Sequence, residues 1–126
     1  MEYRTPIKHA RGLGSAHHGV GHWWAQRLTA VALIPLLIWF TVGVAAHSGA
    51  DYQQAVAWIG SPVNAVLLIL TVVVLFYHGT LGVQVVLEDY VDNDALRLVL
   101  IVLQKFAAVV LGAAGVFAVL KIAFGG

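Results

Sequence analysis

A histidine lies inside a long apolar run of this sequence and has the clearest capacity for chemistry. His78 falls within residues 63–87, a stretch that carries no formally charged side chain. An ionisable side chain in lipid is costly without a partner, so its presence is itself a functional-site hypothesis. Three roles remain open: an axial ligand of a haem iron, a proton relay, or a histidine that hydrogen-bonds to a neighbouring helix.

Two glycines beside His78 favour the ligand role. Gly79 follows it directly, and Gly82 lies one helical turn further along the same face. A flat macrocycle bound to an imidazole needs small residues next to the ligand, because larger side chains would collide with the ring. This local sequence favours a haem ligand at His78, with Gly82 packing against the ring, and leaves the proton relay and the helix-bonded histidine open.

An acidic and aromatic pair, Asp89 and Tyr90, follows His78 at the expected membrane edge. Eleven residues make about three helical turns, so Asp89 returns near the azimuth of His78. A phenol at this level can donate a hydrogen bond to a quinone carbonyl, and a carboxylate can supply protons. The alternative is an interfacial tyrosine beside a solvated acid that ends the helix.

Arg27 lies on the same side of the membrane, at the start of the first apolar run. Trp23 and Trp24 precede it and form an aromatic belt of the kind found at headgroup level. A guanidinium at this position can pair with haem propionates or with Asp89. The alternative is a side chain that extends to the lipid phosphates.

The composition assigns these residues to a membrane protein. The chain has 126 residues, of which 60% are hydrophobic and 10% are charged, and its mean hydropathy is +0.87. So few charges cannot cover a water-soluble surface. The absence of cysteine excludes disulfides and iron–sulfur ligation by this chain. No basic stripe exists to neutralise phosphates, so we expect no nucleic-acid partner.

The hydrophobic pattern predicts an all-α membrane protein with a single membrane-anchor domain over residues 1–126. The expected elements are a tail and three transmembrane helices, over residues 1–22, about 23–46, 63–89 and 96–122, with residues 47–62 as a short connection. Basic residues concentrate in the tail and at the first helix, and the first loop has none. The positive-inside rule therefore predicts a cytoplasmic N-terminus. Because three helices make a thin bundle, we expect partner helices to complete it.

The membrane depth of His78 bears on its ligand partner. His78 lies ten residues before the acidic turn, hence roughly 15 Å below the cytoplasmic edge. Counted from the start of the first apolar run at Leu28, the same depth falls near Ile38 and Trp39, and in the third helix near Ala107 and Ala108. His22 and His47 lie at opposite ends of the first helix. A haem with two histidine ligands would therefore take the second one from a different chain.

These residues resemble a known family. His78 with Asp89-Tyr90 on the second of three helices, and the stretch His22-Trp23-Trp24-Ala25-Gln26-Arg27-Leu28-Thr29-Ala30, resemble the small hydrophobic membrane anchor of succinate dehydrogenase (complex II), in its alphaproteobacterial form. The resemblance extends from about Arg4 to the third helix. It implies an anchor in the bacterial inner (cytoplasmic) membrane that forms a bundle with a second, different anchor chain. It also implies partner flavoprotein and iron–sulfur subunits, which alone carry FAD and iron–sulfur clusters.

The resemblance further implies roles for individual residues. His78 would be an axial ligand of haem b, and its counterpart would come from the second anchor chain. Tyr90 would hydrogen-bond the carbonyl of ubiquinone, with Asp89 beside that site. Arg27 would lie near the haem propionates and the quinone. The chain would catalyse nothing alone, but would supply one haem ligand and part of the quinone-reduction site of an enzyme.

Other functions are open at this point. The anchor of a fumarate reductase has a similar architecture, and a purely structural anchor without haem is a further reading. A small proton-coupled transporter would also carry an intramembrane ionisable group. Such a transporter would be expected to have a membrane-embedded carboxylate, and the three apolar runs contain none.

Overall fold

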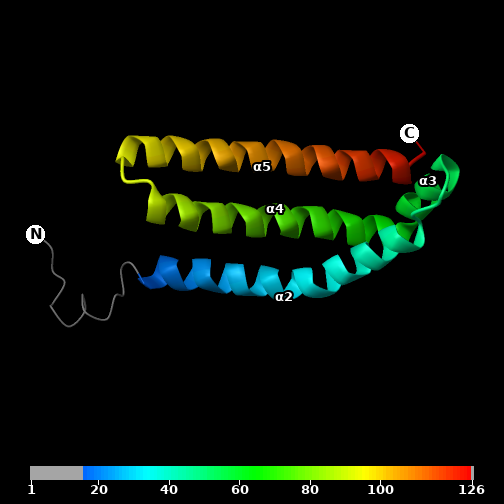
Figure 1. The fold of residues 1–126 in the computed structure, drawn as a ribbon, viewed down its shortest axis with the longest axis horizontal. Coiled ribbons are helices and arrows are strands. Elements are labelled where there is room, and N and C mark those ends of the chain that lie inside the picture. Colours follow the sequence, from blue (N-terminus) through cyan, green and yellow to red (C-terminus); the bar gives the residue numbers. More distant parts are fainter. Residues whose placement is uncertain (1–15, 126) are drawn as a thin grey trace, which may run out of the picture.

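The structure is a computed structural model that describes residues 16–125 and consists there of four helices. The helices are α2 (Ala16–Ala46), α3 (Tyr52–Gly60), α4 (Pro62–Tyr90) and α5 (Asp94–Ala123). Figure 1 shows the three long helices side by side in one layer, with the short α3 at the end away from the N-terminus. Helix α4 contacts both α2 and α5, whereas α2 and α5 do not contact each other.

Each long helix contains a segment that is long and apolar enough to cross a membrane. These segments are Val20–Ala46, Pro62–Tyr90 and Asp94–Ala123. A helix satisfies its backbone hydrogen bonds internally, which lipid requires. The predicted all-α fold with three spans is therefore confirmed. At about 1.5 Å per residue each segment exceeds a hydrocarbon core of about 30 Å, so each tilts or extends beyond it.

The first long helix begins earlier than expected. Helix α2 starts at Ala16, seven residues before the predicted start, and therefore includes Gly19 and Gly21. It also contains Pro35, and its C-terminal half turns towards α3 in Figure 1. The remainder of the expected cytoplasmic tail, including its basic residues Arg4, Lys8 and Arg11, lies outside the described residues.

Helix α3 corrects the interpretation of residues 47–62 as a plain connection. The Asp51 carboxylate accepts a hydrogen bond from the Gln54 backbone at 2.8 Å, and the Gln54 side chain accepts one from the Asp51 backbone at 3.2 Å. This capping box satisfies donors that a helix start otherwise leaves free. The Asp51-x-x-Gln54 spacing is readable in the sequence and was the missed signal.

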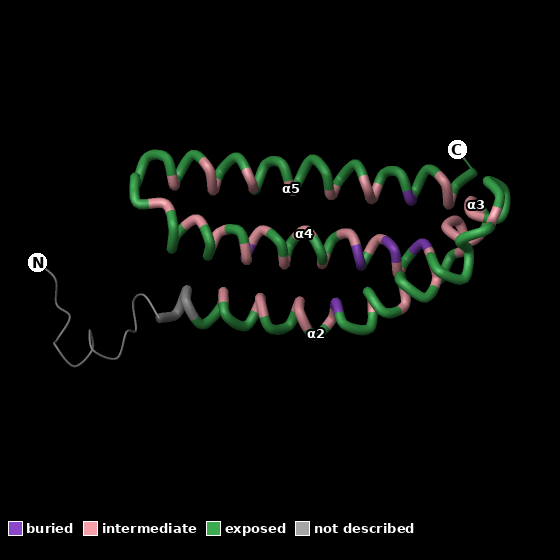
Figure 2. The backbone as a smooth tube through the Cα atoms, viewed as in Figure 1, coloured by how far each residue is buried: buried purple, intermediate pink, exposed green. Residues whose placement is uncertain are grey.

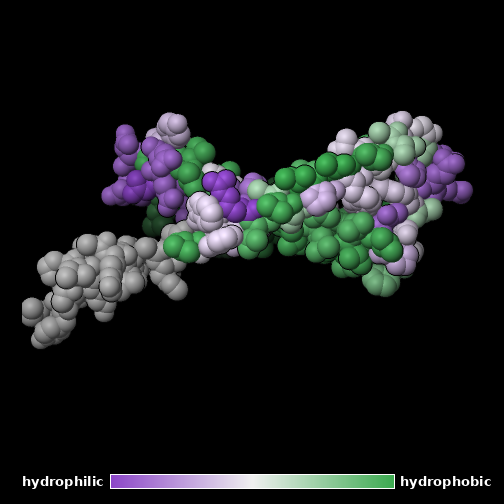
Figure 3. Space-filling model, turned by 90° about the horizontal axis from the view of Figure 1, so that it is seen from below, coloured by the Kyte–Doolittle hydropathy of each residue, from purple (hydrophilic) through white to green (hydrophobic). Residues whose placement is uncertain are grey.

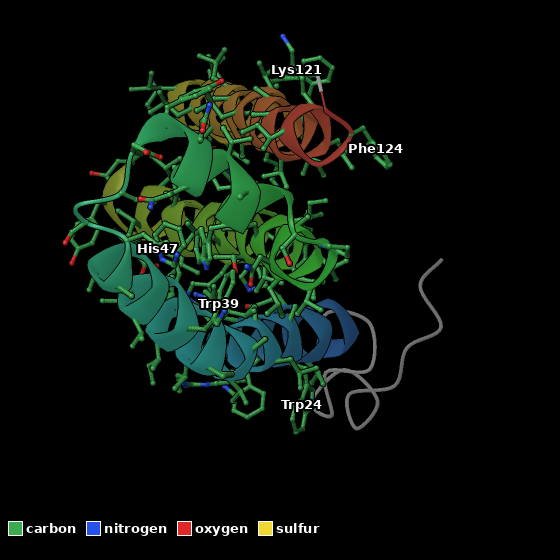
Figure 4. The ribbon with its side chains drawn as sticks, turned by 90° about the vertical axis from the view of Figure 1, so that its right-hand side faces the viewer. Trp24, Trp39, His47, Lys121 and Phe124 are labelled. Atoms are coloured by element: carbon green, nitrogen blue, oxygen red, sulfur yellow. The ribbon has the colours of Figure 1, made fainter. Side chains whose placement is uncertain are left out.

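The packed core lies at the α3 end of the molecule. Buried Ala65, Leu68 and Val119 form a cluster there, which Trp39 and Trp58 cover. Three of the six buried residues, Ala65, Leu68 and Thr71, lie in the half of α4 next to α3 (Figure 2). The Trp39 and Trp58 rings stack with centroids 5.6 Å apart. Figure 4 shows Trp39 of α2 and His47, which directly follows α2, pointing towards the space between the helices, whereas Trp24, Lys121 and Phe124 point outward.

The rest of the helix surface is apolar and exposed. Figure 3 shows mostly apolar side chains along the middle of the visible face, with polar side chains towards its two ends. Among the described residues only five hydrophobic side chains are buried, namely Leu33, Ala65, Leu68, Leu81 and Val119. Large exposed apolar surfaces mark contact with lipid or with other protein chains. The chain therefore relies on its surroundings to cover most of its helix faces.

Candidate functional site

His78 of α4 faces α2 and contacts a threonine there. Its Nδ1 lies 2.9 Å from the Thr29 hydroxyl oxygen. The same hydroxyl lies 2.7 Å from the backbone oxygen of Ala25 and 3.1 Å from that of Gln26. The imidazole is half-buried, and no hydrogen bond joins its Nε2 to any other side chain within residues 20–125. One ring nitrogen is therefore held by this chain, and the other remains available.

The Thr29–His78 contact corrects the expected depth on the first helix. Thr29, rather than Ile38 or Trp39, lies at the level of His78. The estimate counted from Leu28, where formal charge ends, whereas α2 already begins at Ala16. Nine residues separate Thr29 from Ile38, which is about 14 Å along a helix.

The expected depth on the third helix agrees with the structure. Gln104 of α5 donates to the Thr80 backbone oxygen of α4 at 3.4 Å. Three turns of α5 further on, Gly115 lies against Val72, with 3.2 Å between a Cβ built on the glycine and the valine side chain. Ala107 and Ala108 lie between these two contacts, close to the level of His78. Neither can bind a metal.

No second histidine with a described side chain lies at this level. His22 is seven residues before Thr29 on α2, which is about 10 Å along the helix axis. His47 lies at the far end, where its Nδ1 is 2.9 Å from the Gly43 backbone oxygen. Residues 16–125 also contain no group of three or more His, Cys, Asp or Glu side chains that could hold a metal ion. His78 can therefore contribute one ligand to a shared centre.

The two glycines next to His78 have different surroundings. A Cβ built on Gly79 would meet nothing within 4 Å. A Cβ built on Gly82 would lie 3.6 Å from Nε2 of Gln26. The space beside Gly79 is open within this chain, whereas the space beside Gly82 adjoins the Gln26 amide.

Asp89 and Tyr90 are not brought to His78 by the fold. They form the last two residues of α4, and both side chains are exposed, Tyr90 by 81%. Along the same helix Asp89 is about 16 Å from His78. Neither side chain hydrogen-bonds to another described residue. Both side chains are therefore free to contact another molecule at the C-terminal end of α4.

Arg27 points away from the Thr29–His78 contact. Two residues correspond to about 200° around a helix, so Arg27 and Thr29 lie on nearly opposite faces of α2. The Arg27 guanidinium lies over the Trp23 ring, 5.2 Å from its centroid. Within residues 20–125 the one ion pair joins Arg97 to Asp94, so Arg27 and Asp89 are not paired with each other.

Sequence reasoning missed a row of polar side chains on α2. His22, Gln26 and Thr29 follow one another at helical spacing and share the face towards α4. His22 Nε2 and Gln26 Oε1 are sealed from the surface and have no hydrogen-bond partner. Polar residues at i, i+4 and i+7 at the start of an apolar helix were the signal that identifies this row.

The free nitrogen of His78 fits a haem iron. It is an imidazole nitrogen, a donor of the type that binds haem iron, and it is not one of the fully buried polar atoms that lack a partner. The open space beside Gly79 leaves room next to it. The apolar groove of about 690 Å³ between α4 and α5, which Phe76 and Phe117 line, does not include His78.

Comparison with known proteins assigns the family. Residues 1–112 match the family described as succinate dehydrogenase/fumarate reductase transmembrane subunit. The chain is 36% identical to the succinate dehydrogenase hydrophobic membrane anchor subunit of Paracoccus denitrificans over 125 residues, which cover 99% of this chain and 96% of that protein. It is 33% identical to the protein of the same name from Rickettsia bellii over 108 residues, which cover 86% of each chain.

A more distant relative agrees. The succinate dehydrogenase membrane anchor subunit of Reclinomonas americana is 31% identical over 94 residues, which cover 72% of this chain and 78% of that protein. The resemblance inferred from His78, Asp89-Tyr90 and the start of the first helix is thus confirmed. Together with the three apolar spans, these matches identify a multi-pass protein of a bacterial membrane. The chain belongs to the family of succinate dehydrogenase/fumarate reductase transmembrane subunits.

Proposed function

We propose that this chain is the membrane anchor subunit of a bacterial succinate:ubiquinone oxidoreductase. It attaches a flavoprotein subunit and an iron–sulfur subunit to the membrane and forms a bundle with a second anchor chain. It supplies one axial ligand of haem b and part of the ubiquinone-reduction site. The names of its relatives support the anchor role. The observation that carries the haem role is the half-buried His78, with Nδ1 engaged by Thr29 and no partner at Nε2 among the described residues.

His78 Nε2 would bind the haem iron. The second histidine would come from the second anchor chain, because no other histidine with a described side chain lies at this depth. Gly79 leaves space beside the imidazole, and Gly82 would pack against the haem once the flexible Gln26 amide turns aside. When bound, the haem supplies one-electron chemistry close to the quinone. The chain's own contribution is to orient the ligand and to exclude water around it.

The residues that would bind the quinone lie at the C-terminal end of α4. The exposed Tyr90 phenol would donate a hydrogen bond to a carbonyl oxygen of ubiquinone, and Asp89 would carry protons to that site from the cytoplasmic side. Two electrons from an iron–sulfur cluster of the partner and two protons convert the quinone to the quinol. Arg27 would pair with a haem propionate or approach the quinone. Since Arg27 and Tyr90 do not meet within this chain, partner residues must complete the site.

The N-terminus would lie in the cytoplasm under this proposal, together with the turn between α4 and α5. Trp23 and Trp24 would mark the headgroup level on this side. Thr29 lies five residues below Trp24, so His78 would sit about 8 Å beneath the belt. Asp89 and Tyr90 would then extend past the belt towards the soluble partner subunits.

The anchor of a fumarate reductase is the alternative, because the matched family includes both enzymes. A small proton-coupled transporter is not favoured by any observation on the chain. Steady-state rates of succinate oxidation with ubiquinone, and of fumarate reduction with quinol, distinguish the first two. A complex that reduces fumarate faster than it oxidises succinate would support the alternative.

The haem role is tested on the complex purified with its co-purifying partners. We expect His78→Ala to abolish or strongly reduce the haem signal in a reduced-minus-oxidised spectrum. His47→Ala is the matched control, because His47 lies at the other end of α2 and should leave the signal intact. An unchanged haem content in His78→Ala would refute the ligand assignment while leaving the family assignment untouched.

A further inference from the structure

We propose that Thr29 is the positioning residue of His78: its hydroxyl oxygen accepts the Nδ1–H hydrogen bond and so directs the Nε2 lone pair to the haem iron. The proposal rests on the proposed haem role of His78. Its starting observation is the 2.9 Å distance between Thr29 Oγ1 and His78 Nδ1, which joins α2 to α4.

The direction of this hydrogen bond follows from the other contacts of Thr29. A hydroxyl carries one proton, and a backbone carbonyl can only accept. Thr29 Oγ1 is 2.7 Å from the Ala25 oxygen, one turn back on α2, which is closer than it is to His78. Threonine in a helix commonly donates to this carbonyl. With its proton committed there, the oxygen has only lone pairs to offer, and Nδ1 must be the donor.

The tautomer of His78 is thereby fixed. A neutral imidazole has one N–H and one nitrogen lone pair. If Nδ1 bears the proton, the lone pair is on Nε2. Nε2 has no hydrogen-bond partner within residues 20–125, and it is not one of the fully buried polar atoms that lack a partner. The lone pair is therefore available to a group other than the described side chains of residues 20–125.

The ring orientation is fixed by the same contact. The Cβ of His78 holds one side of the imidazole on α4, and the Thr29 bond holds a second point from α2. The Thr29 rotamer is in turn held by its bond to the Ala25 backbone. A ligand histidine anchored at its second nitrogen is the common arrangement in metal sites, where the partner fixes tautomer and orientation.

No other side chain on α2 can take this role in the described structure. Gln26 lies one turn away, against Gly82 rather than His78. His22 is a further turn away, and its Nε2 has no hydrogen-bond partner. Thr29 is thus the only residue of the polar row whose side chain contacts the candidate ligand.

Two measurable consequences follow for the haem. A hydrogen bond accepted from Nδ1–H raises the basicity of the ligand, and loss of such a partner lowers metal affinity by about 10- to 100-fold. A more basic ligand stabilises the oxidised iron more than the reduced iron. Removing the acceptor should therefore raise the haem reduction potential. If Thr29 only filled space, Thr29→Val, which keeps its shape, would change neither the haem affinity nor the haem reduction potential.

The test uses four variants of the complete complex. Thr29→Val keeps the branched shape and removes the hydroxyl, and Thr29→Ser keeps the hydroxyl. Thr71→Val is the matched control, because Thr71 is buried on α4 and donates to its own helix at Leu67, 2.7 Å away, without contacting His78. Thr29→Ala replaces Thr29→Val if the valine variant does not assemble.

The readouts are the rate of haem transfer to a haem-free globin scavenger and the haem reduction potential. We expect about tenfold faster haem loss and a higher potential in Thr29→Val, with Thr29→Ser and Thr71→Val close to the unmodified complex. Unchanged haem loss and potential in Thr29→Val, or a serine variant as impaired as the valine or alanine variant, would overturn the positioning role alone. Full haem content in His78→Ala would instead refute the haem role on which the proposal rests.

Discussion

Gln26 of α2 lies against Gly82 of α4, one turn from the Thr29–His78 contact. A Cβ at Gly82 would be 3.6 Å from the Gln26 side-chain nitrogen, which is ordinary contact distance. The seam between the two helices therefore has room for alanine at position 82 but not for a long side chain. On the neighbouring face, Gly79 has open space.

This difference yields a prediction about where a haem ring would pack. Gly82→Ala should leave assembly and haem content intact, whereas Gly82→Leu should weaken haem binding by about 1–3 kcal/mol, the usual cost of overpacking. Gly79→Leu is the matched comparison. Haem retention against a globin scavenger measures the effect. Loss of haem in Gly79→Leu with none in Gly82→Leu would assign the ring to the Gly79 face and refute the role of Gly82.

The exposed phenol of Tyr90 leads to a second prediction. Tyr90→Phe removes a hydrogen-bond donor at the end of α4 while keeping the ring. We expect ubiquinone reduction to fall about tenfold, which corresponds to about 1.4 kcal/mol in the barrier. Succinate oxidation by a soluble dye should not change, because it bypasses the quinone.

The control for this variant is Tyr77→Phe, since Tyr77 is also exposed but lies on α4 beside His78, about 20 Å from Tyr90 along the helix. It should leave both activities unchanged. Equal loss of dye reduction and quinone reduction in Tyr90→Phe would show a defect in assembly or in electron supply. That result would contradict the quinone role.

The fold was predictable in the segments that cross the lipid, because few backbone conformations are possible there. A backbone in hydrocarbon must be helical, so the apolar runs around His78 and through α5 identify their helices without further information. At the start of α5 the Asn93 side chain accepts a hydrogen bond from the Leu96 backbone at 3.0 Å, the cap that asparagine commonly provides. The resemblance to the family rested on the spacing of His78 and Asp89-Tyr90, because an ionisable residue inside an apolar helix is rare.

The partner of His78 was not predictable from the same sequence. A threonine in an apolar helix usually bonds its own backbone, and nothing in the composition indicates which residue of another helix it meets. That contact depends on the register of α2 against α4, which hydropathy does not indicate. A start estimated from charge alone misplaced the level of His78 by nine residues, from Thr29 to Ile38. Only the contact between the two helices shows which residue of α2 lies at the level of His78.

The contact between Gly43 and Trp58 gives a third prediction. A Cβ at Gly43 would overlap the Trp58 ring, which also stacks on Trp39. Gly43→Ala should therefore displace α3 and destabilise the protein by about 1–3 kcal/mol. Gly49→Ala is the control, because a Cβ there meets nothing within 4 Å. Thermal unfolding of the purified complex measures both, and equal midpoints for the two variants would contradict the packing role of Gly43.

The capping box of α3 gives the last prediction. Asp51→Ala removes the carboxylate that accepts from the Gln54 backbone at 2.8 Å and should destabilise the helix by about 1 kcal/mol. Because α3 has only nine residues, its first turn should open most easily. Hydrogen exchange at residues 52–60 should accelerate several-fold, while exchange in α4 stays unchanged. Asp92→Ala serves as the control, since Asp92 lies in the turn between α4 and α5 and caps neither helix. Unaltered exchange in α3 of the Asp51 variant would mean that packing of Trp58 against Gly43 and Trp39, rather than the cap, holds this helix in place.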